Sequence, residues 1–197
     1  MIDRPAAGQV QVTEVTRIAD PVPVHPLLDG LKEIGRGESS IVLDAGDGQR
    51  VFKVLSSPAD YYYLAADDRP TGLHFPRVYA DHGIVGKATN GYSFRLLEIE
   101  RLLPVAGPAE ILGRRLSQAY WEGCEKWANL GVNRGRLALY HIAQEPPSDF
   151  PVSLVQALRA LSDFIEEYPV QPDILNPDNI MMRPDGTLVL SDPVFLP

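Results

Sequence analysis

The last 25 residues constrain the fold more than any other part of the chain. Asp185-Gly186 is a strong hairpin turn signal, and it separates the apolar runs 180–182 and 188–190. A hairpin of these runs brings Asn179, at its entry, close to Asp192, at its exit. Oxygen-bearing side chains suit a hard cation such as Mg²⁺, which binds one or two protein ligands together with phosphate oxygens. We therefore expect Asn179 and Asp192 to form a metal site.

A second pattern lies near the other end of the chain. Gly35 and Gly37 occur in a loop between two predicted strands, and a turn cluster at 44–48 leads into the apolar run 51–55. Lys53 is the only charge in that run, so the alternation of the strand predicts one polar position that faces a specific partner.

The two patterns together resemble the protein kinase-like superfamily, and in particular small kinase-like proteins of bacteria and their phages. The resemblance covers residues 31–197. It implies an α+β fold, with an antiparallel-sheet N-lobe and a reduced helical C-lobe that ends just after Asp192. The implied division is an N-terminal extension (1–25), a strand-rich N-lobe (26–103) and a truncated helical C-lobe (104–197).

The resemblance also implies ATP and Mg²⁺ as cofactors and gives roles to individual residues. The implied catalytic residues are Lys53 and Asp173, and the implied metal ligands are Asn179 and Asp192. The resemblance also implies that the ammonium group of Lys53 converges with the carboxylate of Asp192. The implied linker, 98–102, would hold the nucleotide base through its backbone. The implied nucleotide-binding residues are Gly35, Gly37, Lys53, Glu98 and Glu100.

The catalytic loop departs from the family pattern. The family places its catalytic Asp five positions before the metal-binding Asn, whereas Asp173 lies six positions before Asn179. Counting back five reaches Ile174, which cannot accept a proton. Three interpretations follow: Asp173 still reaches the substrate hydroxyl, Asp178 replaces it, or the base is lost.

Two further departures concern the ion pair of the N-lobe and the end of the chain. The interval between Lys53 and Glu98 contains no Glu to pair with the lysine. Asp60 could substitute, although the simpler interpretation is that it is an acidic residue in the first turn of a helix, where a negative charge is favourable. The chain also stops five residues after Asp192, so we expect no activation segment.

Three functional interpretations remain. The first is a minimal phosphotransferase that acts on a protein hydroxyl. The second is a catalytically inactive pseudokinase that binds a protein partner. The third treats the likeness as coincidental, because Asn176-Pro177-Asp178 and Asp185-Gly186 are ordinary turn formers.

The composition of the chain limits its possible partners and its cellular location. The net charge of -8 argues against nucleic acid and acidic membranes as partners. A single cysteine cannot form an internal disulfide, which favours a reducing cytoplasm. The sequence has no apolar stretch approaching 18 residues, so we expect no membrane partner.

Periodicity and turn signals predict the secondary structure. A helix that begins after Ser57 with Pro58 at its first position is expected, as are a helix over 108–130 with Gly131 just past its end and an amphipathic helix over 152–168. Residues 131–150 are expected to be mixed. The predicted strands are an edge strand over 9–15, a three-strand meander within 31–55, strands over 73–79 and 92–100, and the hairpin strands 180–182 and 188–190.

Overall fold

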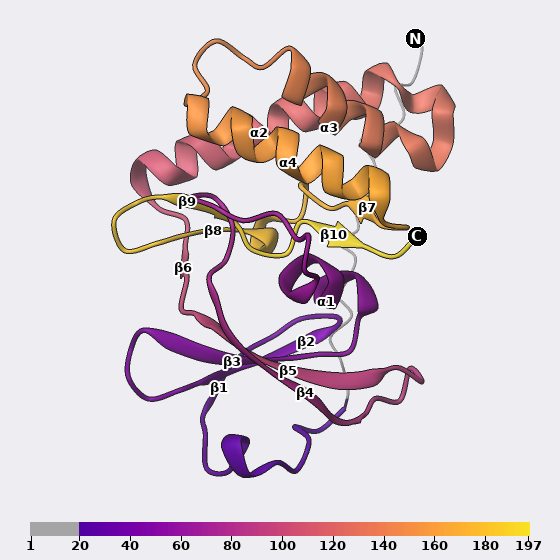
Figure 1. Ribbon diagram of the computed structural model, residues 1–197. Coiled ribbons are helices and arrows are strands. Elements are labelled where there is room, and N and C mark those ends of the chain that lie inside the picture. The colour runs from indigo at the N-terminus through magenta and orange to yellow at the C-terminus, as the bar shows by residue number, and fades with distance from the viewer. Residues whose placement is uncertain (1–19) are drawn as a thin grey trace, which may run out of the picture.

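The computed structural model describes residues 20–197, and these form an α+β structure in which an antiparallel sheet lies beside a helical part (Figure 1). The five strands are ordered β1-β2-β3-β5-β4, and every neighbouring pair is antiparallel. A short 3-10 helix, η1 (Pro26–Leu28), precedes the sheet. The strands are β1 (Glu33–Arg36), β2 (Ser40–Asp44), β3 (Arg50–Leu55), β4 (Val78–Lys87) and β5 (Ser93–Glu100).

Alternation along β3 decides which way Lys53 faces. Val51 and Leu55 are buried in the main core, which continues into the helical part, whereas Val54 belongs to a smaller core on the opposite face of the sheet. Because successive side chains of a strand point to opposite faces, Lys53 shares the face of Val51 and Leu55. Its charge is therefore directed toward the helical part of the molecule.

Helix α1 (Pro58–Ala65) follows β3 and lies between the sheet and the helical part (Figure 1). It begins as predicted. The Ser57 hydroxyl accepts a hydrogen bond from the Asp60 backbone N–H at 3.4 Å, and Pro58 occupies the first turn, where its missing N–H costs nothing. The helix buries Tyr63 and Leu64 in the main core. This packing fixes the position of Asp60, in its first turn.

Three helices form the far side of the helical part (Figure 1): α2 (Gly107–Lys126), α3 (Arg134–Gln144) and α4 (Val152–Glu167). The prediction for 152–168 is confirmed to within one residue. The predicted helix over 108–130 is too long, because α2 gives way to the 3-10 segment η2 (Ala128–Asn133), in which Gly131 has a φ of 57°. Helix α3 was not predicted from the mixed composition of 131–150.

The predicted C-terminal hairpin is confirmed. Strands β8 (Ile180–Met182) and β9 (Leu188–Leu190) pair antiparallel, with Ile180 opposite Leu190. Strand β6 (Leu103–Pro104) extends this pair to three strands. Nearby, β7 (Gln171–Pro172) pairs with β10 (Val194–Phe195), and η3 (Pro177–Asn179) is a short 3-10 turn that leads into β8.

The strand predicted over 73–79 is wrong in position, because β4 begins only at Val78. Residues 73–75 bind the hairpin instead of the sheet. The carbonyl of His74 accepts the Leu190 N–H at 2.9 Å, and the carbonyls of Leu73 and Phe75 accept hydrogen bonds from Arg183. The predicted edge strand over 9–15 lies outside the described residues. Among residues 20–197, no helix combines the length and the apolar character needed to cross a membrane.

Candidate functional site

Lys53 and Asp192, 139 residues apart in the chain, meet as expected from the sequence. The Lys53 ammonium donates to Asp192 Oδ2 at 2.7 Å, and the two side chains are 8% and 18% exposed. Lys53 comes from the middle of β3, and Asp192 follows β9. The contact therefore joins the sheet to the C-terminal hairpin, in a partly buried setting where an ion pair is screened less than at the surface.

Backbone contacts on both sides of Asp192 fix its position. The Tyr63 hydroxyl, from α1, donates to the Leu190 carbonyl, and the Ser191 N–H donates to the Asn179 carbonyl at 2.8 Å. On the other side, the Asp173 N–H donates to the Pro193 carbonyl at 2.7 Å. Helix α1 and the segment 173–179 are thus both attached to the stretch that carries the Asp192 carboxylate.

Asp173 and Asn179 are in direct contact despite the extra residue between them. The Asn179 side-chain amide donates to the Asp173 carbonyl at 2.9 Å and to Asp173 Oδ2 at 2.8 Å. The η3 turn, capped by the side chain of Asn176, accommodates the six-residue spacing. Burial raises the pKa of the Asp173 carboxyl. Ile174 is fully buried, which removes it as a participant in polar chemistry.

Asp60 is the residue whose place in the site the simpler sequence interpretation missed. It is more than an acidic residue in the first turn of a helix, because it is 3% exposed and its carboxylate accepts a hydrogen bond from the Ser39 hydroxyl at 2.5 Å. Burial, followed by the nearby charge of Asp192, raises the pKa of the Asp60 carboxyl to about 7, while Lys53 acts in the opposite direction. Asp60, Lys53 and Asp192 therefore form one electrostatic cluster.

The loop between β1 and β2 lies against this cluster. The carbonyl of Ser39 accepts from the Ser56 N–H at 2.8 Å and from the Ser56 hydroxyl at 3.1 Å, so Ser39 is held on two sides. The Gly37 N–H donates to the Ser40 carbonyl at 2.9 Å and closes the turn. A Cβ at Gly35 or Gly37 would make only ordinary contacts, at 3.7 and 3.5 Å. The fold alone therefore does not require glycine at these two positions.

Glu98 and Glu100 lie within β5 rather than in a free linker. Their backbones pair with Phe52 and Arg50 of β3. The Glu98 carboxylate pairs with Arg50. Glu100 is 6% exposed, and its carboxylate accepts two hydrogen bonds from Arg183, at 2.8 and 2.6 Å. Both carboxylates are thus already occupied by arginines.

The site offers a divalent cation only a small set of protein oxygens. Within residues 20–197, no group of three His, Cys, Asp or Glu side chains is arranged to hold a metal. Among the residues that the structure describes, Asp192 Oδ1 is buried without a hydrogen-bond partner, and both amide hydrogen bonds of Asn179 point to Asp173. The remaining oxygens of Asp192 and Asn179 suit a cation that takes its other ligands from phosphate and water.

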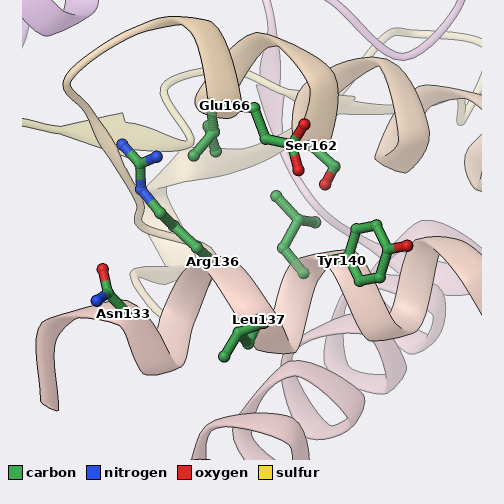
Figure 2. A pocket seen from close by; sticks show the side chains of 8 residues that line it. Asn133, Arg136, Leu137, Tyr140, Ser162 and Glu166 are labelled. Carbon is green, nitrogen blue, oxygen red and sulfur yellow. The ribbon is translucent and has the colours of Figure 1, made fainter. Parts of the chain in front are cut away.

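A separate hollow lies between α3 and α4 (Figure 2). Its volume is about 530 Å³, and none of the predicted site residues lines it. The guanidinium of Arg136, which lines the hollow, donates to the carbonyls of Tyr168 and Val170. Asp60 and Asp173, whose carboxyl pKa values are raised by burial, lie elsewhere, so we place the candidate site there and not in this hollow.

Comparisons of the chain with protein-family models, with curated proteins and with solved structures find no match.

Proposed function

We propose that this chain is a minimal kinase-like protein that binds ATP with Mg²⁺ and transfers phosphate to a protein hydroxyl. The observation that carries the proposal is the 2.7 Å contact between Lys53 and Asp192 at the junction of the sheet and the hairpin. A lysine on an inner strand face, an aspartate after a hairpin and an amide-bearing loop beside it are the parts that position and neutralise a transferring phosphoryl group.

Each residue has a role in this proposal. Lys53 orients the nucleotide phosphates, and the turn at Gly35–Gly37 covers them. Asp192 and Asn179 hold Mg²⁺, which neutralises phosphate charge. Asp173 orients the accepting hydroxyl of the substrate, and its contact with Asn179 supports that role because it ties the two polar groups into one unit.

The inactive, protein-binding alternative has one observation in its favour. Lys53 and Asp192 already neutralise each other, so a nucleotide must separate or share an existing ion pair before it binds. A protein that has lost nucleotide binding could keep this pair as a structural link between the sheet and the hairpin.

Thermal unfolding with and without Mg²⁺-ATP tests the proposal. At 100 times its dissociation constant a ligand stabilises the folded state by about 2.7 kcal/mol, which raises the melting temperature of a chain of this size by roughly 5–11 °C. We expect this increase for the wild type and for Lys87→Met, an exposed lysine of β4, and not for Lys53→Met or Asp192→Asn. The melting temperatures with and without Mg²⁺-ATP are compared within each variant, because both site changes should also lower the stability of the protein without ligand.

A wild type that shows no increase would reject nucleotide binding. An increase without transfer of radiolabelled phosphate to any protein would support the inactive alternative. Asp173→Ala separates nucleotide binding from phosphate transfer, since it should keep the increase in melting temperature and lose transfer to an added protein substrate.

A further inference from the structure

The Ser39 hydroxyl has a position that the proposed function does not use. It lies in the turn that would cover the phosphates, and it donates to Asp60 Oδ2 at 2.5 Å. A serine in an exposed loop is ordinarily solvated. Ser39 instead points inward, to a carboxylate that is 3% exposed and is electrostatically linked to Lys53 and Asp192.

We propose that Ser39 is itself a phosphate acceptor of this site, with Asp60 as the base that takes its proton. The proposal rests on the proposed function, because it requires ATP and Mg²⁺ at Lys53, Asn179 and Asp192. It adds a specific substrate, which is a serine of the same chain.

The step balances without any further reactant. Ser39 Oγ forms a bond to the γ-phosphorus of ATP, and the bond from that phosphorus to the oxygen bridging to the β-phosphate breaks. ADP leaves with the electron pair of that bond. The Ser39 proton moves to Asp60 Oδ2, the atom to which it is already hydrogen-bonded.

The surroundings of Asp60 suit a base more than a structural acceptor. Its backbone N–H donates to the Ser57 hydroxyl, and its carboxylate accepts from the Ser39 hydroxyl; hydrogen bonds from both serines act to lower the pKa of this carboxyl, against the larger effect of burial. A carboxyl whose pKa is raised to about 7 is a stronger proton acceptor than an ordinary aspartate and is still partly ionised at neutral pH. Lys53 and Asp192 face it from β3 and from the hairpin, and Tyr63 follows it on α1.

Asp173 lies outside the cluster of Asp60, Lys53 and Asp192, and the Ser39 hydroxyl already donates to Asp60. Asp173 therefore has no role in the reaction at Ser39, which distinguishes this reaction from transfer to an added protein. A phosphate on Ser39 would bring up to about two negative charges next to Asp60, so the modified turn could not keep its present contact.

Incubation of the full chain with Mg²⁺-ATP, followed by peptide mass spectrometry, tests the inference. Cleavage after Arg36 and Arg50 releases the segment 37–50, which contains Ser39 and its neighbour Ser40. We expect one phosphate on Ser39 in the wild type and in the matched control Ser40→Ala, and none on this segment in Ser39→Ala. The rate constant should not change when the protein is diluted tenfold, because the acceptor and the site belong to the same molecule.

Asp60→Asn keeps the shape of the side chain and removes the base, so labelling should slow by about 100-fold or more. Between pH 5 and 8 the wild-type rate should rise as Asp60 loses its proton, and the Asp60→Asn rate should not. A purely structural Asp60 would not produce this difference between the two pH profiles.

The outcomes separate this inference from the proposed function. If Mg²⁺-ATP raises the melting temperature but the segment 37–50 stays unmodified, the inference is overturned and nucleotide binding stands. If the melting temperature does not change, both nucleotide binding and phosphorylation of Ser39 are rejected. Label that appears on Ser40, that forms at the wild-type rate in Asp60→Asn, or that forms with a rate constant proportional to protein concentration also overturns the inference.

Discussion

Replacement of Arg183 by methionine should destabilise the protein far more than the loss of an exposed ion pair. Arg183 is 4% exposed and its guanidinium donates to both oxygens of Glu100 and to the carbonyls of Leu73 and Phe75. Methionine is similar in length but has no donors. Within the described part of the chain, the change leaves the Glu100 carboxylate, which is 6% exposed, with only the Arg77 N–H at 2.9 Å.

The expected loss of stability comes from the Glu100 charge, which stays buried without its arginine partner. Removing one partner of a buried ion pair typically costs about 3–5 kcal/mol, because a desolvated charge remains. For a chain of 150–250 residues, that loss lowers the melting temperature by roughly 6–20 °C. The double variant Glu100→Leu, Arg183→Met removes both charges, so it should regain about 2 kcal/mol or more of the loss.

Urea unfolding followed by circular dichroism measures these differences. Arg115→Met is the matched control, since Arg115 also binds a carboxylate with two hydrogen bonds, to Asp149 at 3.0 Å, but the pair is about half exposed. That control should lose less than about 1 kcal/mol. A loss of stability in Arg183→Met no larger than that in Arg115→Met, or a double variant less stable than Arg183→Met, would contradict a buried Glu100 charge as the cause.

Three further predictions concern other parts of the molecule. Folding raises the pKa of Asp60 from its ordinary 3.8 to about 7, so the stability that this carboxyl contributes is fully present below about pH 4 and is lost as the pH rises through 7. The free energy of unfolding of Asp60→Asn, measured with urea at each pH, should therefore increase relative to that of the wild type by up to about 4 kcal/mol between pH 4 and 8. Ser57→Ala removes the cap of α1 and should cost about 1 kcal/mol in the same assay, whereas Ser57→Asp should retain most of that stability. Gly123→Ala should cost about 1–3 kcal/mol, because its Cβ would lie 2.8 Å from the Ala138 Cβ; Gly113→Ala in the same helix meets only contacts of 3.5 Å or more, and should be neutral or slightly stabilising.

The elements that the sequence predicted well are those whose signals are local. Helix α4 has apolar residues at helical spacing, α1 has a serine cap followed by proline, and the hairpin has Asp185-Gly186 at its turn. In each case the residues that specify the element lie within it. The secondary structure could therefore be predicted without knowing what packs against it.

Helix α3 was missed because it packs through small residues. Its buried positions include Gly135, Ala138 and Ala143, and Ala138 meets α2 at Gly123. Small residues give a weak apolar period, although they allow two helices to approach closely. The signal for α3 lies in the fit between two helices, which a single segment does not display.

The buried charges show the same limit within the site. Lys53 could be assigned to the inner face because it lies in the middle of a strand, between Val51 and Leu55, so alternation fixes its direction. Arg183 follows the last residue of β8 and stands two positions before the Asp-Gly turn, where no alternation applies and a charged side chain is ordinarily solvated. Asp60 is ambiguous in the same way, since a carboxylate in a helix first turn suits the helix dipole whether it is exposed or buried. What distinguishes Arg183 and Asp60 is the approach of Glu100 and Ser39, which are 83 and 21 positions away. A buried charge can thus be found from sequence only where regular structure already determines its direction, and elsewhere it depends on tertiary contacts.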